Sequence, residues 1–391
     1  MAKLIDITGK ALSGEWGTDD ETGNGTPVLR TTNFTNDGVV DYKDVVTRSI
    51  VKKKIEEKYL RKGDIIIEKS GGSDKQPVGR VIYFDGPENT FLFNNFTGLL
   101  RVQNQSEWYP RYVFYSLYAN YRRGGTKAFE NKTTGLHNLK TDDYVSRHEV
   151  ADADIAKQIG ICDQLDCISD IIRLRQDELQ KLDELVKARF VELFGDMILN
   201  PNSWEKVDLG TVCDVRDGTH DSPKYFAEGI PLVTSRNLSS GRIDFTDCNL
   251  ICEADYNKIN ERSKVDLGDI LMPMIGTVGN PIIVDIDAEF AIKNVALIKF
   301  SENSKVVNVF VKALLESDYF DRAVLDKVRG GTQKFISLGD IRRLNVCLPP
   351  LEVQKQFAAF VTQVDKSKVV VQKALDEAQT LFDSLMQEYF G

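Results

Sequence analysis

Cysteine, histidine and long apolar runs are scarce in this sequence of 391 residues. The six cysteines and three histidines are scattered, and although Cys248 and Cys252 could share a helical face, no second pair stands at metal-ligand spacing. We therefore expect neither a disulfide framework nor a metal site. No stretch of about 18 apolar residues occurs, and the N-terminus, Met1–Asp6, acquires an acid before any long apolar run. These absences predict a cytoplasmic protein without a membrane partner.

Positive charge is also in deficit, because 50 lysines and arginines stand against 59 aspartates and glutamates, for a net charge of −9. This balance excludes a uniformly basic, histone-like nucleic-acid binder, although basic patches on an acidic body remain compatible with it. Apolar residues make up 42% of the chain, as in ordinary globular proteins. At about 150 residues per domain, the length predicts two to three domains.

The motifs of nucleotide-dependent enzymes are missing as well. There is no GxxxxGK(S/T) phosphate loop and no GxGxxG dinucleotide turn. The string Asn200–Ser203 begins like the Asn-Pro-Pro-aromatic motif of amino-methyltransferases, but it lacks the second proline and the aromatic residue. The sequence therefore favours binding over catalysis by this chain.

An internal repeat at an offset of about 200 residues is the most informative feature of the sequence. The matching strings keep the same order and nearly constant spacing, and each copy combines short β-rich runs with a helical pattern, over residues 110–122 in the first copy and 307–328 in the second. The paired strings are Gly25–Phe34 with Gly229–Leu238, Lys62–Ile65 with Leu267–Ile270, Pro77–Gly79 with Thr277–Gly279, and Gly124–Phe129 with Gly330–Phe335.

Each copy ends in a long helical segment with an apolar seam. Residues 155–194 contain no proline, and Gly195 and Gly391 stand where a helix C-cap is expected. Apolar residues recur on alternating three- and four-residue steps, the a/d pattern of a coiled coil. The predicted seam residues are Leu165, Ile168, Ile172, Leu179, Leu182 and Val186 in the first helix, and Val364, Val371, Leu375, Phe382 and Leu385 in the second.

These patterns predict an α+β fold. Two β-rich domains (residues 1–150 and 197–350) are joined by two long helices (151–196 and 351–391). We expect the helices to pair as an intramolecular antiparallel coiled coil, with the two halves related by a pseudo-twofold axis. A coiled coil with another molecule is the alternative.

Positive charge concentrates in three segments: residues 47–62 hold seven basic and two acidic residues, 121–141 hold five and one, and 322–343 hold six and two. The last two segments flank the equivalent Gly-Gly-Thr turns. Glycine turns let backbone amides approach phosphate, and Arg, Asn, Gln and Thr can read base edges. The candidate DNA-binding residues are Arg30, Asn33, Lys52, Lys53, Lys54, Arg122, Arg123, Lys127, Lys132, Arg236, Asn237, Arg329, Gln333 and Lys334.

Several short sequence motifs, together with the repeat and the two long helices, resemble those of a known family. The segment Gly330–Ser337 is followed by Leu344–Gln356, which runs from an apolar strand through Leu-Pro-Pro into a helix start that bears glutamine. With Pro77–Arg80 and with Asn200-Pro201 before Trp204, the chain resembles, over essentially its whole length, the specificity (S) subunit of type I restriction–modification systems. One departure is Val145–Val150, which stands where the second copy has its Leu-Pro-Pro strand.

The resemblance implies that each β-rich domain is a target-recognition domain reading one half of a bipartite site in double-stranded DNA. The helices would set the half-site separation and dock two methyltransferase (M) subunits. S-adenosylmethionine would be carried by the M subunits, and ATP with Mg²⁺ by a restriction (R) subunit where one exists, so the chain itself would bind no cofactor and catalyse no reaction. A coiled-coil adaptor with two protein- or ligand-binding domains is the alternative, and a self-sufficient methyltransferase ranks third.

Overall fold

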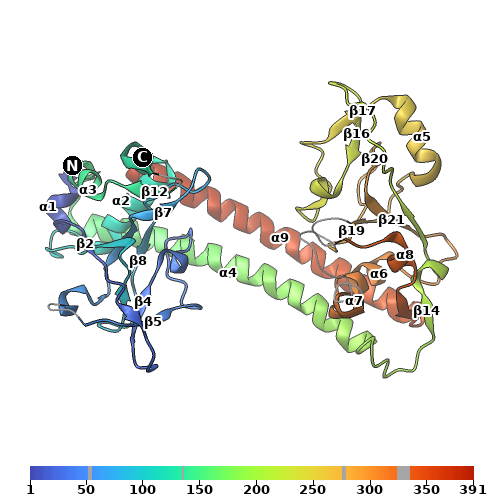
Figure 1. Ribbon diagram of the computed structural model, residues 1–391, viewed down its shortest axis with the longest axis horizontal. Helices are drawn as coiled ribbons and strands as arrows, with labels where there is room; N and C mark the ends of the chain where they lie inside the picture. The colour runs from blue at the N-terminus through green and yellow to red at the C-terminus, as the bar shows by residue number, and fades with distance from the viewer. Residues whose placement is uncertain (52–54, 134–135, 275–278, 324–334) are drawn as a thin grey trace. The chain divides into compact units, whose positions relative to one another are not determined.

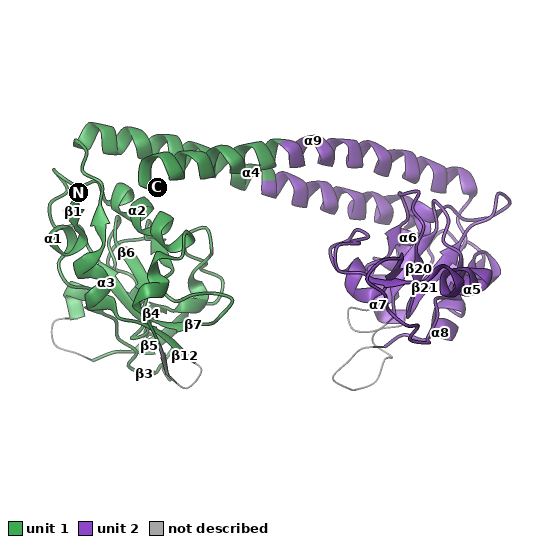
Figure 2. Ribbon diagram, turned by 90° about the horizontal axis from the view of Figure 1, so that it is seen from above, with its two compact units in different colours: residues 1–175, 374–391 green, residues 176–373 purple. Residues whose placement is uncertain are grey.

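The computed structural model describes residues 1–391 apart from 52–54, 134–135, 275–278 and 324–334. The chain divides into two compact units: residues 1–175 with 374–391 form unit 1, and residues 176–373 form unit 2 (Figure 2). Helices α4 (Ile155–Phe194) and α9 (Leu351–Phe390) each contribute to both units (Figure 1). Among the helices of the described residues, none is long and apolar enough to cross a membrane.

Unit 1 contains an antiparallel sheet of order β2-β10-β6-β8 and a mixed sheet of order β3-β5-β4-β9, in which β4 and β9 are parallel. A three-stranded sheet β11-β12-β7 and the pair β1-β13 complete the strands. The bounds are β1 Ala2–Lys3, β2 Leu12–Ser13, β3 Thr18–Asp19, β4 Thr26–Leu29, β5 Val46–Ser49, β6 Ile65–Glu68, β7 Ser70–Gly72, β8 Val81–Tyr83, β9 Leu92–Phe93, β10 Thr97–Leu100, β11 Glu130–Thr133, β12 Leu136–Leu139 and β13 Glu149–Val150, with helices α1 Leu4–Thr8, α2 Pro110–Arg122 and α3 Thr141–Arg147 and 3-10 turns η1 Thr31–Asn33, η2 Ile55–Lys58 and η3 Gly125–Phe129.

Unit 2 repeats this plan. Its antiparallel sheet β15-β21-β18-β19 matches the first sheet of unit 1, the parallel pair β16-β20 matches β4-β9, and β14-β22 matches β1-β13. Within the described part of unit 2, no strand corresponds to β7, β11 or β12. The bounds are β14 Lys206–Asp208, β15 Asp214–Asp217, β16 Ile230–Val233, β17 Asn249–Ile251, β18 Ile270–Pro273, β19 Ile282–Ile283, β20 Ala291–Ile292, β21 Val295–Lys299 and β22 Asn345–Cys347, with α5 Glu253–Ser263, α6 Asn308–Leu315, α7 Asp318–Ala323, α8 Leu338–Arg342, η4 Leu209–Thr211 and η5 Ser235–Leu238.

The α+β fold with an internal repeat is therefore confirmed, but the single helix predicted over residues 307–328 is wrong. The described residues form two helices there, α6 and α7, separated at Glu316–Ser317. The Ser317 hydroxyl donates to the Leu314 carbonyl at 2.6 Å, which ends α6. The turn then places Phe320 in the core, where its side chain is 1% exposed.

A buried carboxylate closes the Gly-Asp turn in both units. Asp64 accepts hydrogen bonds from the Arg101 guanidinium at 2.7 and 2.6 Å and from the backbone N–H of Arg61 at 2.7 Å. Asp269 accepts one from Lys299 at 2.6 Å, and burial raises the pKa of its carboxyl group. Each pair joins the turn before the central strand to the end of the neighbouring strand. The repeated Gly-Asp string therefore has a structural role.

A buried glutamine near the start of each long helix joins that helix to its unit. Gln158 and Gln354 are fully buried, each at the fourth position of its helix. The side-chain oxygen of Gln158 accepts a hydrogen bond from the backbone N–H of Tyr109 at 2.8 Å, and that of Gln354 accepts one from Val307 at 2.9 Å. Tyr109 and Val307 are the N-cap residues of α2 and α6.

Both side-chain amide groups also donate two hydrogen bonds to backbone carbonyls, so neither keeps an unpaired donor in the core. The first copy makes this contact although it lacks the Leu-Pro-Pro string, so the entry into the two helices is equivalent despite the different sequence. The acceptors are Glu107 and Ala153 for Gln158, and Lys305 and Pro349 for Gln354, at 2.8 to 3.1 Å.

The two long helices pack against each other within each unit. In unit 1 the Tyr389 hydroxyl of α9 donates to the side chain of Gln164 on α4 at 3.0 Å. In unit 2 Lys368 of α9 forms an ion pair with Asp183 of α4 at 2.6 Å. Residue numbers rise along α4 as they fall along α9, so the pairing is antiparallel. All eleven predicted seam residues are buried or half-buried, which confirms the intramolecular coiled coil.

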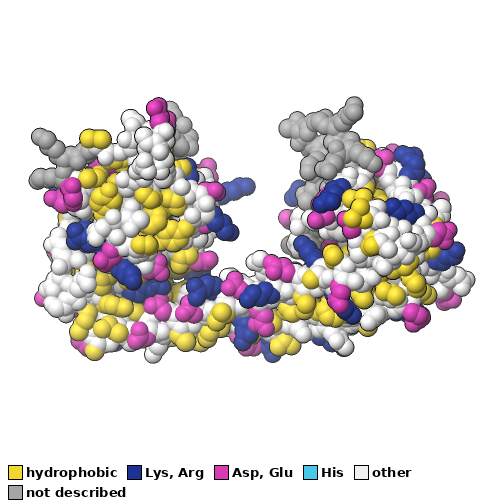
Figure 3. All heavy atoms as spheres, turned by 90° about the horizontal axis from the view of Figure 1, so that it is seen from below, with side chains coloured by type: hydrophobic (Ala, Val, Ile, Leu, Met, Phe, Trp, Pro, Cys, Tyr) yellow, Lys and Arg dark blue, Asp and Glu magenta, His cyan; other side chains and the backbone are white. Residues whose placement is uncertain are grey.

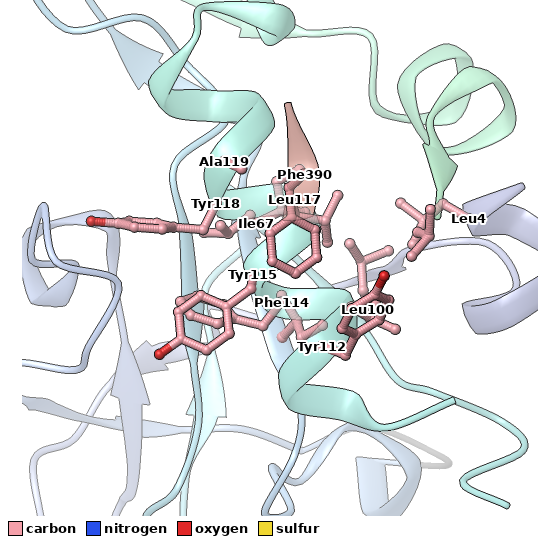
Figure 4. Packing of buried hydrophobic residues seen from close by; sticks show 14 of the residues in the cluster. Leu4, Ile67, Leu100, Tyr112, Phe114, Tyr115, Leu117, Tyr118, Ala119 and Phe390 are labelled. Atoms are coloured by element: carbon pink, nitrogen blue, oxygen red, sulfur yellow. The ribbon is translucent and has the colours of Figure 1, made fainter. Parts of the chain in front are cut away.

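Aromatic side chains anchor the C-terminal end of each long helix. Phe390 of α9 lies against Tyr112 of α2, with ring centroids 5.0 Å apart (Figure 4). Phe194 of α4 lies against Phe310 of α6 at 4.8 Å. Gly195 follows α4 with a φ of +67°, in the left-handed conformation expected of a glycine C-cap.

We predict that Gln158→Leu and Gln354→Leu each lower the free energy of unfolding by about 2–4 kcal/mol, because the N-cap N–H and two carbonyls lose their buried partner. Chemical denaturation of the full chain measures this. Gln363→Leu, on an exposed position of α9, is the control and should stay within about 0.5 kcal/mol of the parent. Equal losses for all three variants would contradict the anchoring role.

Candidate nucleic-acid interface

Two predicted DNA-binding residues, Asn33 and Asn237, lie inside equivalent turns and are 2% and 7% exposed. Each side-chain oxygen accepts a hydrogen bond from the backbone N–H at the start of its turn, that of Arg30 at 2.9 Å or that of Thr234 at 3.0 Å. Each side-chain amide group also donates to a carbonyl further along the chain. These asparagines therefore hold the turns that follow β4 and β16, and in each turn the residue before the asparagine, Thr32 or Arg236, is exposed.

The arginines of these turns have different environments. Arg30 is half-buried and donates to the Asp44 carbonyl at 2.8 Å. Arg236 is exposed, and within the described part of the chain its guanidinium makes no ion pair. Of the two, Arg236 is the cation that is available to a ligand.

In unit 1 the repeated Pro-Val-Gly and Gly-Gly-Thr strings pack against each other. Gly79 has a φ of +105°, and a Cβ there would lie 2.6 Å from Thr126 Cγ2, so the close approach requires glycine. Thr126 is fully buried, whereas Lys127 beside it is exposed. Lys132 belongs to β11, and its side chain is not described.

Two further predicted cations, Arg122 and Arg123, bind the last turns of α9. Arg122 forms an ion pair with Asp383 at 2.7 Å, and Arg123 donates to the carbonyl of Phe390. Cations are stabilised at a helix C-terminus, where the unpaired carbonyls carry partial negative charge. This placement gives both arginines a role within the chain.

The remaining candidates lie outside the described residues: Lys52, Lys53, Lys54, Arg329, Gln333 and Lys334. On the face drawn in Figure 3, basic and acidic side chains are interspersed over each unit, in keeping with the net charge of −9. No group of three or more His, Cys, Asp or Glu side chains among the described residues is arranged to hold a metal ion.

Sequence reasoning missed a polar cluster around His220 in unit 2. The His220 ring nitrogens lie 2.8 Å from Asn294 Oδ1 and 2.8 Å from Asp217 Oδ2, and Arg262 also binds Asp217. The hydrogen bonds to Asn294 and Asp217 raise the pKa of His220 above the ordinary histidine value. The only signal in the sequence is that His220 occupies the place of Trp16 when the two copies are aligned at the offset that relates Gly25 to Gly229.

The sequence of this chain is similar to a known domain family and to curated proteins. Residues 201–378 match the family described as Type I restriction modification DNA specificity domain. The chain is 24% identical over 220 residues to the EcoBI specificity subunit of Escherichia coli, covering 54% of this chain and 46% of that protein. It is 20% identical over 390 residues to the EcoKI specificity subunit of E. coli K12, covering 92% and 80%.

The fold has a solved counterpart. The S subunit of a type I restriction–modification system from M. genitalium superimposes with a TM-score of 0.60 at 17% identity, covering 100% of this chain and 95% of that one. The chain spans about half the length of three of the curated relatives that it matches, at 46%, 46% and 45%.

We predict that Arg123→Ala lowers the free energy of unfolding by about 1 kcal/mol, because the end of α9 loses a charged hydrogen-bond donor. Lys127→Ala, at an exposed position five residues after the end of α2, is the control and should leave the free energy of unfolding unchanged. Denaturation of both variants measures the difference. A neutral Arg123→Ala variant that binds DNA more weakly would instead place this arginine at the nucleic acid.

His148 provides a second prediction. Its side chain packs on Tyr144 and lies 3.3 Å from the Ser116 hydroxyl, and burial with the nearby Arg123 charge lowers its pKa to about 4. In the unfolded chain the pKa of His148 returns to about 6.5. The free energy of unfolding therefore falls by at most about 3 kcal/mol as the pH drops from about 6.5 to about 4. His148→Gln should flatten this part of the stability profile. An unchanged slope would show that His148 titrates normally.

Proposed function

We propose, from the type I restriction modification DNA specificity domain at residues 201–378 and from the S-subunit fold of the chain, that this protein is the DNA-recognition subunit of a type I restriction–modification complex. Each unit reads one half of a bipartite site in double-stranded DNA. The chain itself is not an enzyme, binds no cofactor and acts in the cytoplasm.

Duplication of one fold within one chain is the observation that carries this proposal. The strand order β2-β10-β6-β8 returns as β15-β21-β18-β19, and the turns closed by Asn33 and Asn237 return with it. A DNA site made of two separated halves requires two reading units held by one spacer. The paired helices α4 and α9 supply that spacer.

The same helices offer a surface for methyltransferase subunits. Two M subunits, carrying S-adenosylmethionine, would dock there, and an R subunit with ATP and Mg²⁺ would join them where one exists. Large apolar side chains are exposed along both helices, and a protein partner would cover them. They are Ile159, Ile171, Leu174, Leu185 and Val191 on α4, and Leu351, Val369, Val370 and Leu381 on α9.

The test is modular exchange. The full chain is co-expressed with a methyltransferase subunit of a type I system and used to select duplexes from a randomised library. We expect a two-part motif, and replacement of residues 1–150 by those of a relative should change one half of the motif only. Arg329→Ala, at a residue outside the described ones, should reduce the salt slope of binding by about 1 if it contacts phosphate.

Two results would contradict the proposal. A change in both half-sites after a single exchange would show that the units do not read DNA independently. Failure of the complex to select any motif would favour the coiled-coil adaptor.

A further inference from the structure

The backbone of the loop after β15 is fixed to the turn that joins β20 and β21, next to the strand with which β15 pairs. A Cβ at Gly218 would lie 2.2 Å from the Ile292 carbonyl oxygen, so only glycine permits the approach. Thr219 exchanges backbone hydrogen bonds with this turn, donating to Ile292 at 3.0 Å and accepting from Asn294 at 3.2 Å. Asn294 has a φ of +55°, a conformation that asparagine tolerates. This geometry sets His220 beside the Asn294 side chain.

The His220 ring is held at both nitrogens by oxygen acceptors, a carboxylate on β15 and a side-chain amide oxygen on the turn before β21. With the Asn294 amide oxygen turned towards the ring, both acceptors are satisfied when both ring nitrogens carry a proton, which gives the imidazolium form. Loss of that proton would leave one nitrogen lone pair facing an oxygen. The cluster therefore stabilises a positive charge on a side chain that is 64% exposed.

The charged groups around His220 come from several elements. Asp217 on β15 binds both His220 and Arg262 of α5, and Asp221 follows His220 in the loop. Lys293, on the turn before β21, reaches Ser222 at 2.6 Å. The Ser235 hydroxyl donates to the Asn294 carbonyl at 3.5 Å, and the exposed Arg236 is the next residue along the chain.

The charged side chains of this cluster carry only a small net positive charge when His220 is neutral. The proton on His220 therefore changes that net charge by a large fraction. Three basic residues, Arg236, Arg262 and Lys293, stand against Asp217 and Asp221. Protonation of His220 doubles the net positive charge of the cluster from one to two. In unit 1 the equivalent position is Trp16, whose ring is covered by the Arg48 guanidinium at 4.3 Å and does not titrate.

We propose that this cluster is the surface by which unit 2 contacts the DNA phosphate backbone, and that the contact requires the protonated form of His220. The inference rests on the proposed function and names one site of it. Binding through unit 2 then weakens as the pH rises through the pKa of His220, whereas unit 1 contributes no such dependence at the equivalent position.

The experiment measures binding of the complex of the full chain and its methyltransferase partner to a fluorescent random-sequence duplex of about 40 base pairs, from about pH 6 to about pH 8 at constant ionic strength. We expect the parent to lose at least about threefold in affinity over this range. His220→Gln should bind at pH 6 as weakly as the parent does at pH 8. Its salt slope at pH 6 should be lower by about 1.

Two further variants distinguish an effect of the His220 charge from a purely structural role of its side chain. His220→Arg carries a permanent charge and should retain affinity at pH 8, which a purely structural role would not produce. His148→Gln is the matched control in unit 1, because its pKa of about 4 leaves it neutral over the whole range. If the parent binds the duplex and His220→Gln keeps the parental pH profile, the cluster is not the contact. If the parent does not bind at any pH, the proposed function itself fails.

Discussion

The position of the two long helices depends on one buried side chain in each unit, Gln158 or Gln354. Each side-chain amide group binds the N-cap of a neighbouring helix and carbonyls around the start of its own helix. A helix that rotated or slid would leave these polar groups unpaired away from water. Apolar seams have no such directional requirement, because burial depends on area alone. The glutamines therefore fix the register in which the seam of α4 meets that of α9.

On this scaffold, the two units keep the same interior and differ at their surfaces. The Gly-Asp turns and the turns closed by Asn33 and Asn237 recur with the same hydrogen bonds. The loop after the first strand of the antiparallel sheet instead presents Trp16 in one unit and His220 in the other. Loops held by a rigid frame can change their chemistry without loss of the fold. Such a division suits the proposed function, in which each unit reads its own half of the DNA site.

Basic residues in the sequence are not all available to a nucleic acid. Arg122 and Arg123 sit in a basic cluster, yet both bind the C-terminal end of α9, where the helix dipole attracts them. Arg236 and Lys127 remain exposed. In an acidic chain, these local differences decide which faces can attract phosphate, since charges further than about 8 Å away are largely screened.

Periodicity and repetition in the sequence determined the two long helices, their apolar seam and the duplicated α+β plan, because each of these is a local pattern or a comparison of local patterns. The helix bounds Ile155–Phe194 and the burial of Leu165 follow from such patterns. Only the tertiary structure decided the roles of Arg123 and His220. Their partners lie far along the chain, 74 residues away for His220 and Asn294 and 267 for Arg123 and Phe390. Such contacts arise from packing of separate elements, which no local spacing encodes.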